Sequence, residues 1–416
     1  MLNRIVFYKL FGIFNYDINL KEGGVTILTG PNGFGKSTIL KTIHAFNTFD
    51  IMFFSNLDFK KILFYSKDYK EPVCIKKNDT EIIIDSFIIN TNLLEKNLLK
   101  KIKRPYIFRV DDDNWYNRRT EEVYSKTELI ENFLSNNELE DSIDFDPIKF
   151  RDTKDKLKKY SGETKFIKEQ RLLKEENISR FERQTIKVIE EIPEKLKKKM
   201  NMVSTKYSSE ANKLDSSYPN RLFKTKKGIT KEKYEQSIKS MNEKFEKLNK
   251  YNISDIKRLE EQVVFLDEHS KALKIYFEDF EKKYEVFEDF IDQLDLFTDI
   301  INSRLKFKEI KISRDEGIVV YKSNTSERLR LDQLSSGEKQ EIILFYELIF
   351  ESEKNIHLLI DEPEISLHIE WQLKFMDDLL KIVEKKKFKV TVATHSPQII
   401  NNHWDIQIDL GELYGN

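Results

Sequence analysis

The chain has 416 residues, of which 39% are hydrophobic, enough to build a substantial core. Its 71 Lys and Arg are balanced by 72 Asp and Glu, so no overall charge draws it to nucleic acid or membrane, and any basic surface must be local. The single cysteine, Cys74, excludes an internal disulfide and a thiolate metal cluster. No segment approaches the roughly 18 apolar residues of a membrane span, and the N-terminus lacks a secretory cleavage pattern. We therefore expect a cytoplasmic protein with no membrane partner.

The first 45 residues alternate short apolar runs with turn residues. This pattern predicts three strands, with a glycine-rich loop and a helix after the third. The three runs are Ile5 to Leu10, Tyr16 to Leu20 and Val25 to Thr29.

Residues 50 to 160 mix two kinds of pattern. Lys61 to Tyr65 and Glu81 to Ile89 are typical of strands, whereas Lys126 to Leu139 is typical of a helix. We expect a small α+β accessory lobe here.

Residues 176 to 305 are rich in Lys and Glu and poor in glycine. From Ile256 to Leu305 apolar residues recur mostly every three or four positions, which predicts one long helix capped by Ser254. A partner helix is expected from Ile178 to Leu214, interrupted at Pro193, with turns at 217–220 and Gly228. These helices form either an arm or short coiled coil, or a compact bundle packed on the rest of the protein.

Strand patterns return after residue 306, at Phe307 to Ile312, Ile318 to Tyr321 and Glu327 to Leu331. We therefore expect an α/β fold in which one domain is split between the two ends of the chain. The expected segments are 1–48, the N-terminal half of that domain; 49–160, the accessory lobe; 161–175, a further strand of the split domain; 176–305, the helical arm; and 306–416, the C-terminal half.

The segment GPNGFGKS, Gly30 to Ser37, has P-loop spacing and lies between a predicted strand and a predicted helix. Glycines let the backbone wrap around phosphates, so that N–H groups and the helix N-terminus face negative charge. Lys36 is expected on the β- and γ-phosphates, and the Ser37 hydroxyl on Mg²⁺. The full set expected to contact ATP is Asn32, Gly33, Gly35, Lys36, Ser37 and Thr38.

A second element is IHLLIDEPE, residues 356 to 364, an apolar strand that ends in two carboxylates. A strand buried in a parallel sheet delivers its last residues to the edge where ligands bind. Asp361 is expected to hold Mg²⁺, and Glu362 to orient and deprotonate the attacking water. Taken alone, an acidic pair after a strand is usually a solvated turn.

Two further segments could contact phosphate. LSSGEKQ, Leu334 to Gln340, places a Ser-Ser-Gly turn before a predicted helix at 341–350, where hydroxyls and N–H groups converge; without its neighbours it is only a helix cap. VTVATHSP, Val390 to Pro397, is an apolar strand that ends at His395, which could donate to a γ-phosphate.

The order of these motifs resembles that of ABC-type ATPases: Walker A at 30–37, signature at 334–338, Walker B at 356–362 and switch histidine at 395. The resemblance implies an ABC-type split nucleotide-binding domain that hydrolyses ATP with Mg²⁺, with Glu362 and His395 as catalytic residues. It also implies that Ser335 and Gly337 act on nucleotide held by a second copy, so we expect a homodimer or higher homo-oligomer, and Glu338 is a further residue expected to contact nucleotide. Ser336 and Glu338 stand where the family pattern has Gly and Gln, as in the SMC-related and OLD-related branches.

Three weaker assignments follow from the same resemblance. Gln170 resembles the Q-loop glutamine that joins the Mg²⁺ shell, and His368 lies in the D-loop region, where it could cross to the partner site or be a surface histidine. Tyr16 or Phe14 could stack on adenine, with core packing expected for at least one of them.

The C-terminal motifs are most similar to the stand-alone ATPases of bacterial antiphage systems such as Septu, PARIS and retron-associated ATPases. That similarity implies a sensor or scaffold that controls a separately encoded effector, a nuclease or toxin, in response to DNA or a phage protein. The alternative is an SMC-like DNA-maintenance or repair ATPase that clamps nucleic acid, for which the clusters Lys197 to Lys199 and Lys224 to Lys227 are the only support. Such clusters on a helical arm are usually a solvated face.

Overall fold

The computed structural model describes residues 1–22, 24–85, 87–101, 106–110, 114–118, 122–125, 147–179, 182–253, 265–325 and 327–415. These residues form two compact units. The first unit comprises 1–169, 353–363 and 379–416, and the second comprises 170–352 and 364–378. Within the described residues, no helix has both the length and the apolar content that crossing a membrane requires.

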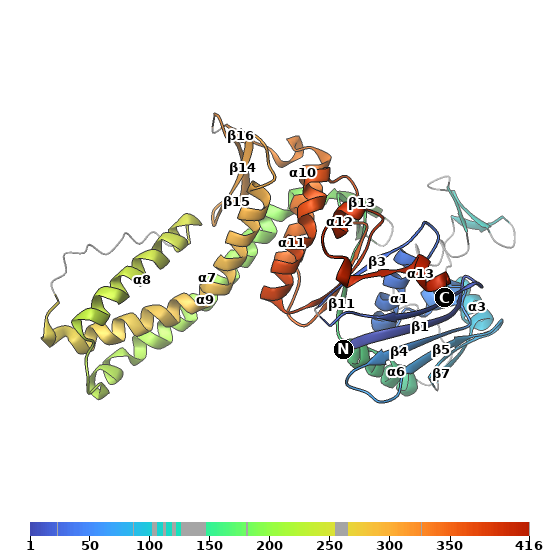
Figure 1. Cartoon of the computed structure of the whole chain (residues 1–416), viewed down its shortest axis with the longest axis horizontal. Coiled ribbons are helices and arrows are strands. Elements are labelled where there is room, and N and C mark those ends of the chain that lie inside the picture. The colour runs from blue at the N-terminus through green and yellow to red at the C-terminus, as the bar shows by residue number, and fades with distance from the viewer. Residues whose placement is uncertain are drawn as a thin grey trace. The chain divides into compact units, whose positions relative to one another are not determined.

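A five-stranded parallel sheet forms the centre of the first unit, and it confirms the predicted α/β fold with a parallel sheet (Figure 1). Its strand order, β11-β17-β18-β3-β19, joins segments from both ends of the chain. Strands β3 and β17 are buried at every position, as expected for strands covered on both faces. The strands are β3 (Val25–Thr29), β11 (Thr164–Ile167), β17 (His357–Asp361), β18 (Lys389–Ala393) and β19 (Gln407–Asp409).

A six-stranded antiparallel sheet lies in the same unit, in the order β2-β1-β4-β5-β6-β7. Helix α1 (Lys36–Thr48) shares one hydrophobic cluster with both sheets, and its Phe46 stacks on Phe64 of β4 at 3.8 Å. Because β1 pairs directly with β4, the expected boundary at residue 48 falls inside one sheet. The strands are β1 (Leu2–Leu10), β2 (Phe14–Asn19), β4 (Lys61–Ser66), β5 (Val73–Lys77), β6 (Glu81–Ile84) and β7 (Phe87–Asn90).

The remaining elements of the first unit are short, apart from α6, which packs on α1. The predicted helix at 126–139 lies outside the described residues. These elements are α2 (Ile51–Asn56), α3 (Thr91–Lys101), β8 (Ile107–Arg109), β9 (Asn114–Asn117), β10 (Glu122–Ser125), α6 (Pro147–Ser161), α12 (Pro397–Ile400), η3 (Trp404–Ile406) and α13 (Leu410–Gly415).

Three helices, α7 (Val188–Lys224), α8 (Lys231–Lys250) and α9 (Ser270–Asn302), pack together in the second unit (Figure 1). Two predictions about α7 are wrong: it continues through Pro193, and the expected turn at 217–220 is helical. Each proline lies beyond the first turn and removes one backbone hydrogen bond from the helix, a loss that packing must offset. The apolar residues on one side of α7 continue past Pro193, so packing favours a single helix. The turn occurs instead at 225–230, around Gly228.

The partner helix begins later than the sequence predicts, because residues 178–179 and 182–187 belong to two antiparallel strands, β12 (Leu173–Ser179) and β13 (Glu182–Lys187). The β-branched residues Thr185 and Ile186 favour this extended conformation.

The long helix expected from 256 to 305 is shorter in the structure. Helix α9 begins at Ser270, after a 3-10 turn η1 (Asp267–His269), and ends at Asn302. The apolar pattern has a gap from Leu266 to Leu273, and the polar residues in that gap form the turn. Ser254 and the start of the predicted helix, 254–264, lie outside the described residues.

A buried charge cluster ties α9 to the other elements of the second unit. The Arg304 guanidinium donates to Asp378 at 2.7 Å, approaches Glu341 at 3.2 Å without hydrogen-bond geometry, and lies 4.7 Å from the Phe345 ring. Burial raises the pKa of Glu341 to about 7 despite the nearby arginine. The remaining elements here are β14 (Lys308–Ser313), β15 (Gly317–Lys322), β16 (Arg328–Leu329), η2 (Leu331–Gln333) and α10 (Ser336–Phe350), together with α11 (Ile369–Lys386), which runs from the second unit into the first.

The pH dependence of stability should report on His357, at the start of β17. Its ring lies 2.8 Å from the Thr391 hydroxyl of β18, and burial lowers its pKa to about 3. Between pH 6.5 and 3 only the unfolded chain takes up this proton, so acid destabilises the fold. We predict that lowering the pH from 6.5 to 5 removes about 2 kcal/mol of unfolding free energy through this group.

Urea unfolding at the two pH values checks this prediction. His357→Gln should show a shallower loss of stability than the unsubstituted chain, whereas the control His368→Gln, at an exposed histidine, should not. Equal pH slopes for His357→Gln and the unsubstituted chain would contradict it.

Candidate functional site

The loop between β3 and α1 has the backbone of a phosphate-binding loop. Gly30, Gly33 and Gly35 have φ of 137°, 83° and 86°, which side chains disfavour. A Cβ on Gly33 would meet no atom within 4 Å, so this side of the loop is open. The Lys36 ammonium donates to the carbonyls of Gly30 at 2.8 Å and Pro31 at 3.0 Å, and so closes the loop upon itself. Asn32 is exposed on the loop, and Thr38 is half-buried in the first turn of α1.

The loop is held in place by Tyr16, a contribution that sequence reasoning missed. The Tyr16 hydroxyl donates to the Phe34 carbonyl at 3.0 Å, and burial raises its pKa to about 12. Its ring stacks on Phe14 at 5.4 Å, and both rings are buried. The core packing expected for at least one of these aromatics holds for both, so neither ring is placed to stack on adenine.

The C-terminal segment also braces the loop. A Cβ on Gly30 would lie 3.2 Å from Cβ of Leu410, a tight contact that adds to the preference for glycine at a φ of 137°. Asp409 accepts hydrogen bonds from the Thr29 hydroxyl at 3.1 Å and from the Gly411 N–H at 2.7 Å. This contact could not be predicted from the sequence. Strand β19 is short and polar, and Thr29 and Asp409 are 380 residues apart in the chain.

Ser37 and Asp361 meet at the carboxyl edge of the parallel sheet. The Ser37 hydroxyl donates to Asp361 Oδ1 at 2.8 Å. Burial raises the pKa of Asp361, while the hydrogen bond from Ser37 opposes that rise, and the charges of Glu169 and Glu362 add to it. A buried carboxylate beside a hydroxyl and other carboxylates is stabilised by a cation, so this pair fits Mg²⁺. Among the described residues, no group of three or more His, Cys, Asp or Glu side chains could hold a metal by itself.

Glu362 follows Asp361 in a left-handed backbone conformation, with φ of 42°. Its N–H donates to the Ala393 carbonyl at 2.9 Å, which fastens the end of β17 to the end of β18. Its carboxylate lies 3.3 Å from Nε2 of His395, which follows β18. Both side chains are about one-third exposed, so they face solvent at the same sheet edge. The structure thus brings together Lys36, Ser37, Asp361, Glu362 and His395.

The LSSGEKQ segment begins α10 in the second unit. Ser335 is the N-cap and is exposed, and it forms a capping box with Glu338. Glu338 also forms an ion pair with Lys308 at 2.8 Å. Although Glu338 was expected to contact nucleotide, its carboxylate is already engaged by the cap and by Lys308. A Cβ on Gly337 would lie 2.6 Å from the Ser366 carbonyl, so close packing requires glycine there.

Gln170 and His368 also belong to the second unit, and both are exposed. Gln170 follows the end of β11 by three residues. His368 precedes α11 and accepts the Glu370 N–H at 3.3 Å. Because both side chains are exposed, each is available to a ligand or a second copy. The Q-loop role of Gln170 and the D-loop role of His368 stay predictions.

Comparison with solved structures gives low similarity. The Smc head domain with an extended coiled coil bound to the C-terminal domain of ScpA from Pyrococcus furiosus is 13% identical, with 96% of this chain and 91% of that chain covered and a TM-score of 0.37. The SmcHead bound to the C-winged helix domain of ScpA is 11% identical, with 96% and 92% covered and a TM-score of 0.37. At such TM-scores neither match carries an argument.

A sequence comparison with curated proteins finds no match. The model of the AAA ATPase domain family, in contrast, matches residues 11–400, which include the phosphate loop, the acidic pair and the histidine described above. Because that match covers most of the sequence, the chain belongs to the AAA ATPase domain family.

Proposed function

We propose that this protein binds ATP with Mg²⁺ and hydrolyses it. The observation that carries the proposal is the 2.8 Å hydrogen bond between Ser37 and Asp361, which joins the phosphate loop to the acidic strand end. A hydroxyl from the loop and a carboxylate at the end of another strand of the sheet are the two protein ligands that hold Mg²⁺ in P-loop proteins. When bound, Mg²⁺ would neutralise phosphate charge there, and Gln170 would complete its shell.

Each of the other site residues has a defined task in this proposal. Lys36 exchanges its two carbonyl acceptors for phosphate oxygens, and the open side of Gly33 receives the phosphates. Glu362 accepts a proton from water, and His395, 3.3 Å away, orients that carboxylate and donates toward the γ-phosphate.

We also propose that two copies complete each site, as in ABC-type ATPases. Ser335 is exposed at the N-terminus of the 15-residue helix α10, where backbone N–H groups and the helix dipole attract an anion. Ser335 and Gly337 of one copy would then contact nucleotide bound by the other. Part of this proposal is that α7, α8 and α9 form an arm inserted in the ATPase domain.

For the biological role we propose control of a separately encoded effector, in the manner of the antiphage ATPases that the motifs resemble. Two ion pairs support this choice over nucleic-acid clamping. Lys197 pairs with Glu194 at 2.7 Å, and Lys199 with Glu351 at 3.4 Å, so this basic cluster is largely neutralised. A surface neutralised in this way gives little attraction for phosphate backbones.

Glu362→Gln should bind ATP but lower its turnover by about 10² to 10⁴, because the general base is lost while the charge on Mg²⁺ and the phosphates is kept. Phosphate release and nucleotide affinity are measured together. Glu353→Gln, at an exposed position before β17, is the matched control and should retain turnover. Turnover of Glu362→Gln equal to that of the unsubstituted protein would exclude Glu362 as the base.

A complementation assay tests the shared site. Lys36→Ala and Ser335→Arg chains should each be inactive, whereas a mixed dimer should regain one intact site, with Lys36 from one chain and Ser335 from the other. We expect about half the turnover of the unsubstituted dimer, since one of two sites is restored. A verified mixed dimer without ATPase activity would argue against a shared site.

Nucleic-acid affinity at two salt concentrations separates the two roles. We expect weak DNA binding that changes little when Lys197 and Lys199 are replaced by Gln. A clamp would instead bind tightly, with a salt slope that falls by about one for each lysine removed. That second result would favour the DNA-maintenance role.

A further inference from the structure

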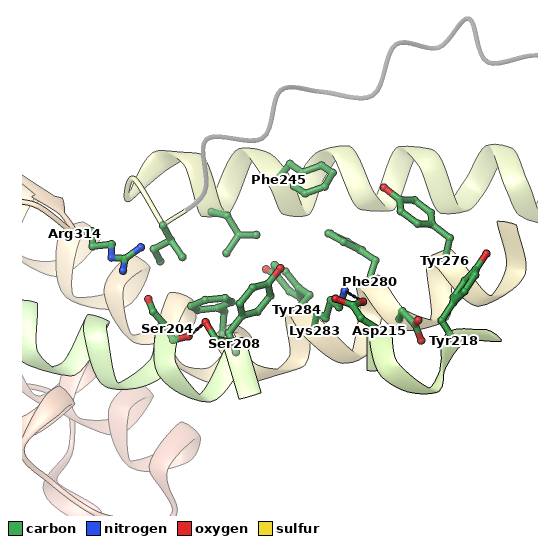
Figure 2. A pocket seen from close by; sticks show the side chains of 15 residues that line it. Ser204, Ser208, Asp215, Tyr218, Phe245, Tyr276, Phe280, Lys283, Tyr284 and Arg314 are labelled. Atoms are coloured by element: carbon green, nitrogen blue, oxygen red, sulfur yellow. Dashed lines mark hydrogen bonds and ion pairs between the residues drawn. The ribbon is translucent and has the colours of Figure 1, made fainter. Parts of the chain in front are cut away.

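A cavity of about 620 Å³ lies among the three long helices of the second unit, separate from the residues assigned to ATP. Figure 2 shows side chains from α7, α8 and α9 directed into it, with Arg314, which follows β14, at one end. Sites for small organic ligands range from about 300 to 1,000 Å³. The cavity therefore has the size of a ligand site, and an occupant would contact three helices at once.

Much of the cavity lining is aromatic. Phe245, Tyr284 and Phe287 are each less than 6% exposed. Phe245 packs against Phe280 at 4.8 Å, and Phe287 against Tyr207 at 5.0 Å. Aromatic faces from different helices bind planar rings by stacking and edge contacts, each worth about 0.5–1.5 kcal/mol. This aromatic lining therefore favours a flat aromatic ligand.

Two acidic residues of the cavity are neutralised by ion pairs with basic side chains. Asp215 pairs with Lys283 at 2.8 Å. Asp279 receives a bidentate contact from Arg221, with one bond of 2.6 Å, in the geometry that best neutralises a carboxylate. Each of these two carboxylates is therefore balanced by a basic side chain.

Arg314 differs from the other charged residues of the cavity. Its Nε donates to the Asn201 amide oxygen at 3.4 Å, and among the described residues no carboxylate lies within ion-pair distance of its guanidinium. The nearby Ser204 and Ser208 hydroxyls donate to backbone carbonyls of their own helix, so these two donors are engaged and Arg314 supplies a charged donor at this end. A guanidinium in this state is suited to a carboxylate, sulfonate or phosphate.

We propose that this cavity binds a small aromatic anion, with its ring among the lining side chains Phe245, Tyr284 and Phe287 and its anionic group on Arg314. Nucleoside monophosphates and aromatic carboxylic acids both have this chemistry. The site goes beyond the proposed ATPase function and does not depend on it.

Two fluorescent probes that differ by one charge test the site: anilinonaphthalene sulfonate and its neutral analogue N-phenyl-1-naphthylamine. Every full-length chain in the assay also carries Lys36→Ala, so that the phosphate loop does not compete. The anionic probe should saturate one site, and Arg314→Gln should weaken it about tenfold, the effect of losing one charge-assisted hydrogen bond. The neutral probe should change by less than about twofold, because it makes no such bond.

Ser204→Trp fills the cavity from α7 and should abolish binding of both probes, while Ser208→Trp provides a second filling variant one turn away. Arg328→Gln is the matched control: it removes an arginine paired with Glu316 outside the cavity and should leave both affinities unchanged. Melting temperatures verify that each variant is folded.

The results that would overturn the proposal are equally specific. If folded Ser204→Trp and Ser208→Trp bind the anionic probe as well as the parent, the probe does not occupy this cavity. If Arg314→Gln weakens both probes equally, or neither, the cavity has no anion site. Displacement of the bound probe by adenosine monophosphate or by phenylacetate then identifies which source of aromatic anion fits.

Discussion

Parallel pairing of β3, β18 and β17 is the constraint on which the candidate site depends. These strands come from opposite ends of the chain, and their registers align Leu28 with Ala393 and Ala393 with Asp361. Parallel strands end at the same sheet edge, so the loop after β3, the acidic pair after β17 and the histidine after β18 must meet. The apolar side chains that bury this sheet thus also determine the distances between the polar groups.

Much of the site could be predicted because its signals are local. A phosphate loop is specified within eight residues, by glycines at positive φ and a lysine at the start of a helix. The apolar run before Asp361 marks a buried strand, and the run before His395 marks another. That the ends of these strands lie near the phosphate loop could be inferred, because buried parallel strands can be arranged in only a few sheet topologies.

The features that could not be predicted depend on contacts between distant residues. The lysine that engages Glu338 lies 30 positions upstream, and the tyrosine that holds the phosphate loop belongs to another strand. Pairing of β1 with β4 also spans a long segment, so composition suggested a boundary where the sheet is continuous. In helix α7 a local signal was misleading. Its prolines predict interruptions, but the helix is continuous because the apolar residues along one side pack as a single helix.

The closed state of the phosphate loop bears on the kinetics of nucleotide exchange. Lys36 holds two carbonyl oxygens of its own loop, so an arriving phosphate displaces internal acceptors rather than meeting an unsolvated charge. The same two oxygens receive the ammonium again as a spent nucleotide leaves. The free loop is therefore stabilised by an intramolecular competitor, whose effective concentration is fixed by the fold, and the net affinity for nucleotide is lowered. Product inhibition should then be weaker than the number of phosphate contacts alone would suggest.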